Sequence, residues 1–324
     1  MKIIVMKFGG SSLADPDKIR RAAAAVLAAR RDARFPVAVV SAPADSTDDL
    51  LALGRLCAGD ELPPREADAL MAAGEQISAS LLAAAAADLG ARAVSLTGQQ
   101  AGIRTDSRFS SATVLSVRPA RLRKEIGKGN IPVVAGFQGS DREGNITTLG
   151  RGGSDLTAVV LARALNASVC EFLTDVKGIY TAHPAIVPSA RRLAEISYAE
   201  VLALARLGTE VRQLRAVAYA ARHSIPLHLR SAFHDEPGTL VTAGAGRKPG
   251  VSCLSLLKEG AVARIGLVGT GLGRGHAADA LKAAGPRAGV RSSSRREIVI
   301  SVPAASAEDA VRALHSRFFP GAQG

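Results

Sequence analysis

The chain has 324 residues, enough for one large domain and a smaller second one. Alanine, leucine and valine are abundant and aromatic residues are few, a composition typical of a soluble α/β protein. The net charge of +12 comes mostly from dispersed basic residues without interleaved aromatic side chains, which argues against nucleic acid as a partner. Charged residues interrupt the alanine-rich stretches, so no membrane span is expected.

The N-terminus and the cysteines both indicate a cytoplasmic protein. The N-terminus leads directly into a predicted strand and a polar loop, which is not the pattern of a secretory signal. Cys57, Cys170 and Cys253 lack the spacing of metal ligands, and two of them lie in apolar runs. We therefore expect reduced, buried thiols and no protein metal site.

The first predicted elements surround a loop that is suited to phosphate. A strand at residues 2–6 is followed by the sequence KFGGSS (7–12) and by a helix that starts at Pro16. A lysine and paired glycines between a strand and a helix are typical of a phosphate-binding loop. The lysine precedes the glycines, so this is no Walker loop, and G-x-G-x-x-G is missing. The alternative is an ordinary turn with a surface lysine.

Two further stretches carry polar residues at informative positions. A strand at residues 36–40 ends at Ser41, and ligands of open α/β sheets bind beyond the carboxyl ends of strands. Ser41 and Thr47 are therefore placed to reach a ligand, although helix capping ahead of residue 48 is the simpler interpretation. A glycine and an acid, Gly74 and Glu75, interrupt an otherwise apolar helix predicted at residues 66–89 and require an explanation.

A glycine-rich loop at residues 147–155 lies between a buried strand (131–137) and a helix (156–165). Its glycines allow close approach of an anion to the backbone, and the helix that follows offers its positive end. Ser154 or Asp155 would cap this helix, which is the simpler interpretation of both. Arg151 is harder to explain structurally, because a guanidinium on such a loop suits bidentate binding of a carboxylate or phosphate.

The rest of the chain continues the alternation of strands and helices. Further strands are predicted at 93–96, 168–173 and 226–231, and further helices at 120–128, 196–205 and 211–222. This pattern predicts an α/β fold with a mainly parallel sheet covered by helices on both faces.

Several separated motifs, in this order, resemble the amino acid kinase superfamily and, within it, the aspartate kinases. The resemblance extends from Met1 to about Thr242. Its motifs are KFGGSS (7–12), VVSAPADSTDDLL (39–51), AAGEQIS (72–78), TGQQAGI (97–103), AGFQG (135–139), TTLGRGGSDLTA (147–158), FLTDVKGIYTAHP (172–184) and PLHLRSAF (226–233). It implies transfer of the ATP γ-phosphate to the side-chain carboxylate of L-aspartate, which gives 4-phospho-L-aspartate.

The resemblance also implies the residues of the site. Contacts to ATP are expected from Lys7, Phe8, Gly9, Gly10, Ser41, Thr174, Asp175 and Tyr180. Contacts to aspartate are expected from Thr47, Glu75, Arg151 and Ser154, with Arg151 on the α-carboxylate and Glu75 on the α-ammonium. The side-chain carboxylate is already ionised and needs no general base, so catalysis requires a cation at the phosphoryl group. Lys7 is that expected cation and Asp155 orients it, while Mg²⁺ arrives with ATP.

The sequence departs from the family pattern on the nucleotide side. Ala185 and Glu210 stand where the family usually has an arginine and a lysine. Either the nucleotide is held differently or phosphoryl transfer is weakened. Two hypotheses follow: an active aspartate kinase, and a weakened homologue that binds an amino acid or partners another subunit. A kinase of a related small amino or carboxylic acid is a variant of the first.

The C-terminal part resembles a single ACT regulatory module. Residues 262–269 and 297–318 match the second ACT module of the family, and residues 251–257 resemble the strand that completes it. The expected domains are the kinase domain (1–242), a linker (243–250) and an ACT-like domain (251–324), with the first ACT module missing. An exposed sheet edge of a lone module favours self-pairing, so a homodimer through this domain is expected.

Overall fold

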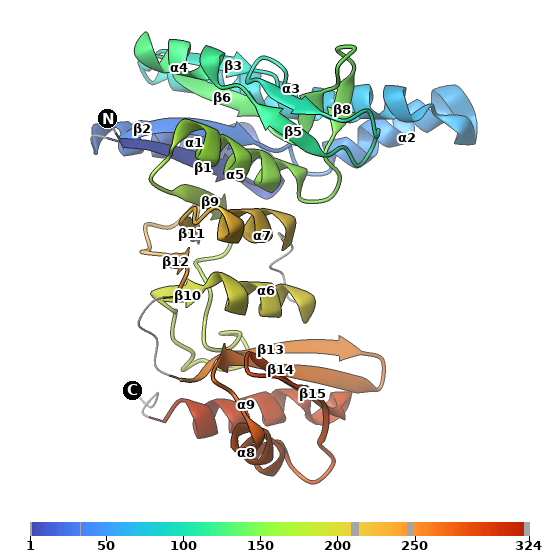
Figure 1. Cartoon of the computed structure of the whole chain (residues 1–324), viewed down its shortest axis with the longest axis vertical. Coiled ribbons are helices and arrows are strands. Elements are labelled where there is room, and N and C mark those ends of the chain that lie inside the picture. Colours follow the sequence, from blue (N-terminus) through green and yellow to red (C-terminus); the bar gives the residue numbers. More distant parts are fainter. Residues whose placement is uncertain (1, 33, 209–213, 245–248, 321–324) are drawn as a thin grey trace. The chain divides into compact units, whose positions relative to one another are not determined.

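The computed structural model describes residues 2–32, 34–208, 214–244 and 249–320. The chain forms two compact units, each made of two segments. The first unit contains Met1–Lys177 and Arg222–Glu236, and the second contains Gly178–Ala221 and Pro237–Gly324. Figure 1 labels the elements of both units.

The first unit contains the predicted alternation of strands and helices. Its strands are β1 (Lys2–Phe8), β2 (Arg34–Val40), β3 (Ala93–Leu96), β4 (Ile103–Thr105), β5 (Val114–Val117), β6 (Ile131–Ala135), β7 (Gln138–Ser140), β8 (Ile146–Thr148), β9 (Cys170–Thr174) and β11 (Leu227–Ser231). Its helices are η1 (Gly10–Leu13), α1 (Pro16–Arg31), α2 (Ser46–Ala58), η2 (Gly59–Glu61), α3 (Pro64–Asp88), α4 (Ala120–Gly127) and α5 (Gly153–Leu165).

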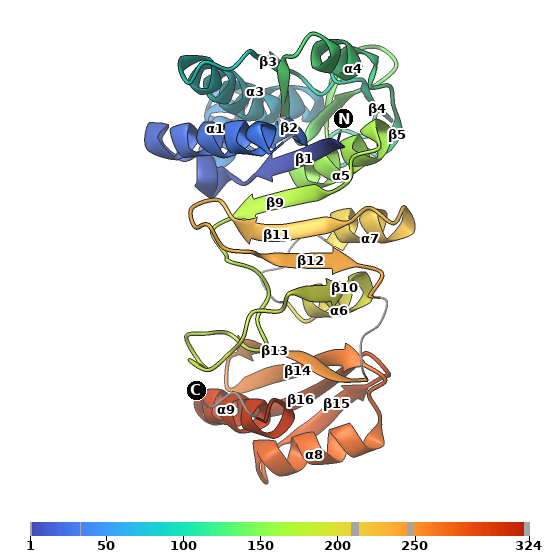
Figure 2. The same cartoon turned by 90° about the vertical axis from the view of Figure 1, so that its left-hand side faces the viewer.

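The central sheet of this unit is parallel, with the strand order β11-β9-β1-β2-β6-β3. Alternate residues of β1 face opposite sides of the sheet. Ile4, Met6 and Phe8 join a buried core with α1 and α3, whereas Lys7 faces α5. The predicted mainly parallel sheet with helices on both faces is therefore confirmed, and Figure 2 shows these layers.

Local sequence explains where the helices begin. At α1, the Asp15 carboxylate accepts a hydrogen bond from Lys18 N at 2.8 Å, and Pro16 occupies the first helical position. Both features are typical of a helix N-terminus.

A small sheet in the order β5-β4-β7-β8 was not expected in this form, since its strands are only three or four residues long.

Among the described residues, α3 is the one helix that is long and apolar enough to count as a candidate membrane span. By length and hydropathy, Pro64–Asp88 is apolar enough to cross a bilayer, although no such segment was predicted. Half of its most apolar window is buried, and the helix packs on β3, β6 and β8. It also carries the buried acids Asp68 and Glu75, so it is a core helix of the first unit.

The second unit contains strands β10 (Glu195–Ser197), β12 (Thr239–Thr242), β13 (Gly250–Glu259), β14 (Val262–Thr270), β15 (Gly289–Ser293) and β16 (Glu297–Pro303). Its helices are α6 (Tyr198–Arg206), α7 (Leu214–Arg222), α8 (Arg274–Ala284), η3 (Ala304–Ser306) and α9 (Ala307–Phe318). Arg222, the last residue of α7, already belongs to the first unit. The helix predicted at 196–205 corresponds to α6, and its first two predicted residues belong to the short strand β10. The start of the helix predicted at 211–222 lies outside the described residues.

An antiparallel sheet, β13-β14-β16-β15, forms the C-terminal part of this unit. Ala263, Ile265 and Leu267 of β14 point into a core shared with α8 and α9. Gly266 faces the other side, where an added Cβ would lie 2.3 Å from Leu207 Cδ1, just beyond α6. The sheet is therefore covered on both faces, and the predicted small C-terminal α+β fold is confirmed.

The compact units divide the chain elsewhere than the predicted boundary at residue 242. Residues 178–221 pack with the C-terminal sheet, and Ala182 and Val187 belong to its apolar core. Glu200 of α6 also accepts a hydrogen bond from Ser252 Oγ of β13. Part of the predicted linker 243–250 lies outside the described residues.

Candidate active site

The two predicted catalytic residues lie in contact. Lys7 of β1 and Asp155 of α5 form an ion pair, with Nζ 2.7 Å from Oδ1, and their side chains are only 8% and 9% exposed. A cation this deeply buried requires a nearby carboxylate to offset its lost hydration. The arrangement is what the predicted orienting role of Asp155 requires, and that role remains a prediction.

The start of α5 differs from the capping interpretation of Ser154 and Asp155. The N-cap is Gly152, in a left-handed conformation with φ of 69°, and no side chain caps the helix. Ser154 and Asp155 lie inside the first turn and are buried. The expectation that one of them caps α5 is therefore wrong, because the helix begins at Gly153. An acid in the first turn is favoured by the helix dipole.

Glu75 lies in a buried, incompletely paired environment. Its side chain is in α3, its exposure is 3%, and its Oε1 accepts a hydrogen bond from Ala42 N at 3.0 Å. In the described parts of the chain, Oε2 has no hydrogen-bond partner. Burial raises the pKa of Glu75 to about 7, although the Ala42 N–H and the charge of Lys7 act in the opposite direction. A buried carboxylate with one free oxygen is suited to an incoming cation.

Gly74 explains why a glycine precedes this acid. A Cβ at Gly74 would lie 2.8 Å from the Ala42 Cβ, which is closer than side chains pack. The glycine therefore lets α3 approach the loop after β2, and this approach brings Glu75 to Ala42 N. Gly74 and Glu75 therefore act together, because the glycine permits the close approach that positions the acid.

The loops after β1 and β2 pack together at the carboxyl ends of their strands. Ser41 N donates to Phe8 O at 3.2 Å, and Ala44 N donates to Gly10 O at 3.2 Å. A Cβ at Gly10 would lie 2.8 Å from Ala42 O, so only glycine fits this approach. Ser41 and Thr47 are half-buried, and the N-cap of α2, Asp45, forms no side-chain cap.

Two residues of the expected phosphate loop are engaged in ways that the sequence does not reveal. The Phe8 side chain is fully buried in the core, so only its backbone faces the loops. Gly9 N already donates to Leu173 O at 3.3 Å, so this backbone amide of the predicted phosphate loop is engaged within the protein. A Cβ at Gly9 would lie 3.8 Å from Lys7 Nζ, an ordinary contact distance, so Gly9 borders the lysine ammonium.

The substrate-side residues Arg151 and Ser154 differ in environment. Arg151 is exposed on the loop between β8 and α5, and in the described parts of the chain no carboxylate pairs with it. Ser154 is buried beside Gly136, where an added Cβ would lie 3.0 Å from Ser154 Oγ. The structure thus leaves the Arg151 guanidinium available to a ligand.

The remaining predicted nucleotide contacts are divided between the units. Thr174 ends β9, and its carbonyl accepts a hydrogen bond from Ala232 N at 2.7 Å. Asp175 follows it and is exposed. Tyr180 belongs to the second unit, where it forms a β-bridge with Arg192. Ala185 is exposed, and Glu210 lies outside the described residues.

Asp68, which was not predicted, supports the glycine-rich loop at residues 147–155. Asp68 is fully buried in α3 and accepts hydrogen bonds from Thr148 N at 2.7 Å and Thr148 Oγ1 at 2.8 Å. It also accepts from Ser110 N at 2.9 Å. The available signal was its position about two helical turns before Glu75, which places both acids on the buried face of α3.

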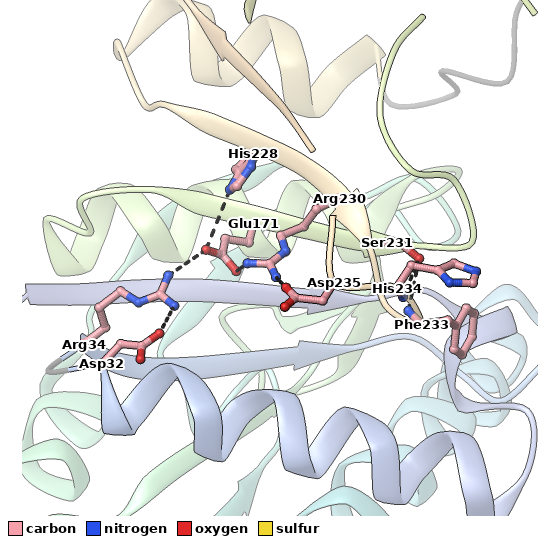
Figure 3. Close-up of polar contacts among 9 residues, drawn as sticks. All are labelled: Asp32, Arg34, Glu171, His228, Arg230, Ser231, Phe233, His234 and Asp235. Atoms are coloured by element: carbon pink, nitrogen blue, oxygen red, sulfur yellow. Dashed lines mark hydrogen bonds and ion pairs between the residues drawn. The ribbon is translucent and has the colours of Figure 1, made fainter. Parts of the chain in front are cut away.

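Glu171 of β9 is a second buried acid that was not predicted (Figure 3). It forms ion pairs with Arg34 at 3.0 Å and Arg230 at 3.8 Å, and its Oε1 lies 3.9 Å from His228 Nδ1. Burial acts to raise the pKa of Glu171, but the His228 hydrogen bond and the charges of Arg230 and Arg34 outweigh it and lower the pKa. Glu171 itself lies on β9, three residues before Thr174, one of the predicted nucleotide contacts.

The thiols and acids offer little to a metal ion. Cys170 and Cys253 are buried as expected, but Cys57 is exposed, because α2 buries little of its surface. Burial raises the pKa of the Cys170 thiol. Among the described residues, no group of three His, Cys, Asp or Glu side chains is placed to hold a metal ion. Delivery of Mg²⁺ by ATP remains a prediction.

Comparison with known proteins identifies the family of this chain. The model of the amino acid kinase family matches residues 2–231. The chain belongs to this family. Amino acid kinases with curated names are similar over this part: an aspartokinase of Mycolicibacterium smegmatis is 49% identical over 242 residues, and one of Corynebacterium glutamicum is 47% identical over 243 residues.

The alignments cover 74% of this chain and 57% of each of these relatives, so the chain spans just over half of their length. Among solved structures, E. coli aspartokinase III in complex with aspartate and ADP is similar with a TM-score of 0.83, at 24% identity over 98% of this chain and 100% of that one. Aspartate kinase from Synechocystis is similar with a TM-score of 0.66, at 28% identity over 98% of this chain and 69% of that one.

Proposed function

We propose that this amino acid kinase is an ATP-dependent aspartate kinase that phosphorylates the side-chain carboxylate of L-aspartate. The observation that carries the proposal is the arrangement of Glu75 beside the Lys7–Asp155 pair. Glu75 offers a buried, free carboxylate oxygen for an ammonium, and Lys7 offers a held cation for a phosphoryl group. The similarity to curated aspartokinases supports the same substrate.

The proposed reaction needs positioning and charge more than it needs proton transfer. A carboxylate oxygen of aspartate attacks the γ-phosphorus, the bond to the bridging oxygen breaks, and ADP leaves with that electron pair. Lys7 stabilises the charge on the transferring group, and Asp155 holds the Lys7 ammonium in place. Arg151 binds the α-carboxylate and Glu75 the α-ammonium, which turns the side-chain carboxylate toward the phosphate. Mg²⁺ bound to ATP neutralises phosphate charge.

The test is aspartate-dependent release of ADP from Mg-ATP, with hydroxylamine present to trap the acyl phosphate as a hydroxamate. Succinate, which lacks the ammonium, and D-aspartate, which inverts it, are the substrate controls. The Lys7→Ala variant is the negative control, because it keeps the aspartate-binding residues. Turnover with L-aspartate alone supports the proposal. Equal turnover with succinate would contradict the role of Glu75, and no turnover would contradict aspartate kinase activity.

A weakened homologue is the second candidate. Its support is Ala185, an exposed residue where the family usually has an arginine that contacts the nucleotide. Calorimetry distinguishes the two functions: a weakened homologue binds L-aspartate but produces no hydroxamate above the Lys7→Ala background. Replacement of Ala185 by arginine would then lower the KM or Kd for ATP.

We also infer that the C-terminal sheet is ACT-like and forms a homodimer in the cytoplasm. The support is β15, an outer strand of this sheet whose residues 290–293 are exposed. An exposed outer strand presents backbone groups for pairing with a second copy. Light scattering coupled to gel filtration gives the mass, and a monomer at micromolar concentration would contradict the inference. Val290→Lys, at a position 42% exposed, is expected to weaken the dimer.

A further inference from the structure

Residues 179–193 form a closed segment that is built into the second unit. Thr181 N donates to Arg191 O at 2.9 Å, and Leu193 N donates to Ile179 O at 2.8 Å, which closes the base of the segment. Between these bonds, Ala182 and Val187 are buried in the core of the C-terminal sheet and its helices. This segment carries Tyr180, the predicted nucleotide contact. The position of Tyr180 therefore depends on how the segment packs against the C-terminal sheet and its helices.

Thr181 is the point where this segment is held most closely. Leu254 N of β13 donates to Thr181 O at 2.8 Å. The Thr181 hydroxyl lies 2.8 Å from His315 Nε2 of α9 and accepts from Arg191 N at 3.0 Å. Both side chains are buried, with exposures of 4% and 2%. One residue thus joins the segment to a strand and to a helix of the C-terminal fold.

The environment of His315 favours a neutral ring. The hydrogen bond between the Thr181 hydroxyl and His315 Nε2 can run in either direction, depending on which ring nitrogen carries the proton. Donation to Nε2 requires a neutral imidazole with its proton on Nδ1. Burial and the nearby charge of Arg191 lower the pKa of His315, which favours that neutral form. The His315 ring also stacks on Phe319, with centroids 4.7 Å apart.

We propose that His315 is a positioning residue for nucleotide binding, which acts through Thr181 to hold the 179–193 segment and its Tyr180. The inference rests on the proposed function, because it assumes that Tyr180 contacts ATP. It goes beyond that function, because it assigns a role in nucleotide affinity to a helix at the far end of the sequence. His315 itself does not touch substrate in this proposal.

The experiment compares full-length variants in the aspartate-dependent ADP assay. Thr181→Val removes the hydroxyl with little change of shape, and His315→Ala removes the acceptor. His315→Gln places an amide oxygen where Nε2 lies and so preserves the acceptor. His276→Ala is the matched control, because His276 stacks on Phe318 of the same helix pair, with centroids 6.5 Å apart, and among the described residues no hydrogen bond or ion pair joins it to the segment. Thermal unfolding identifies any variant that does not fold.

Loss of one buried hydrogen bond predicts a KM for ATP that rises about fivefold in Thr181→Val and His315→Ala. The KM for aspartate and kcat should change by less than about twofold, and His315→Gln and His276→Ala should resemble the wild type. The proposal is overturned if the KM for ATP is unchanged in both variants. It is also overturned if both KM values and kcat shift together and His315→Gln gives no rescue.

A second measurement separates this proposal from the proposed function. Binding of a fluorescent ATP analogue to the same variants is measured without aspartate. If the wild type shows no aspartate-dependent turnover, the proposed function fails, yet weaker binding of the analogue to Thr181→Val and His315→Ala still supports the role of His315. Equal binding by all variants would overturn it.

Discussion

Among single residues, Arg151 gives the most specific prediction about substrate binding. Its guanidinium is exposed and has no carboxylate partner in the described chain, as a residue awaiting an anionic ligand would be. Arg151→Ala should raise the KM for aspartate about 10- to 100-fold, since a charge-assisted, bidentate contact is lost. Arg142→Ala, at an exposed position in the turn between β7 and β8, is the control for general charge effects. An unchanged KM would remove Arg151 from the substrate site.

Glu75 gives a prediction about pH. Its folded-state pKa, about 7, is raised above the ordinary value of 4.5, so its contribution to stability is complete below about pH 4.5 and is lost as pH rises through 7. The loss amounts to about 3 kcal/mol. Glu75→Gln cannot ionise, so its unfolding free energy should exceed that of the wild type increasingly from pH 5 to pH 8. Parallel stability profiles for the two proteins would contradict the raised pKa.

The same group predicts how substrate affinity depends on pH. An ammonium requires the charged form of Glu75, so the KM for aspartate should fall as pH rises toward 7 and then level off. Glu75→Gln should have a high KM without this dependence. A pH-independent KM in the wild type would show that Glu75 does not bind the ammonium.

At the scale of elements, the approach of α3 to the loop after β2 is testable through Gly74. In Gly74→Ala the new Cβ would lie 2.8 Å from the Ala42 Cβ, so the loop or the helix must shift. The shift should weaken the Glu75–Ala42 hydrogen bond and raise the KM for aspartate about tenfold. Gly127→Ala, also in a helix but with open space around the new Cβ, is the matched control. Normal aspartate kinetics in Gly74→Ala would mean that the contact is adaptable.

The parallel strands β2, β9 and β11 are joined across their face by the Glu171 cluster (Figure 3). Glu171→Gln should cost about 3 kcal/mol of stability at neutral pH, because the partly exposed Arg34 and Arg230 lose a buried carboxylate partner. The folded pKa of Glu171 is lowered, so this stabilisation is present above the unfolded value of 4.5 and is lost as pH falls through the folded value. The deficit of Glu171→Gln should therefore shrink in acid. Glu308→Gln, in an exposed pair with Lys258, should show no such deficit.

Which elements could be predicted follows from how local their signals are. Helix α1 was predictable because Pro16 and a long apolar pattern lie within it, and β1 because it is a continuous apolar run. The short strands β4, β7 and β8 were not, because each has three residues and is defined by its neighbours in space. Tertiary pairing, unlike helix periodicity, leaves no mark within three residues.

The candidate site divides in the same way. Lys7, Arg151 and Glu75 were predictable because each is a charged residue in a glycine-rich or apolar context. Their partners were harder to predict: the contact of Glu75 with Ala42 N spans 33 residues, and Asp68 contacts Thr148 across 80 residues. Sequence context identifies a charge that requires a partner, but the fold determines which partner it meets.

At the scale of the whole molecule, the compact units place residues 178–221 with the C-terminal fold, although a resemblance-based boundary falls at residue 242. The reason lies in side chains that such a boundary would separate. Ala182 and Val187 are buried with Leu254 and Leu267, and Gly208 packs where an added Cβ would lie 2.9 Å from Leu257. A cut at residue 242 would therefore expose apolar surface within one core.

This division predicts the behaviour of a shortened chain. A protein of residues 1–242 should bind the dye ANS strongly and aggregate, because about half of one apolar core is missing. Co-expression of residues 243–324 as a separate chain should restore a soluble complex with low dye binding, since it returns the strands and helices that cover Ala182 and Val187. The rescue distinguishes loss of the core from a general effect of truncation. A soluble 1–242 protein that unfolds cooperatively without binding the dye would mean that residues 178–221 fold without the C-terminal sheet.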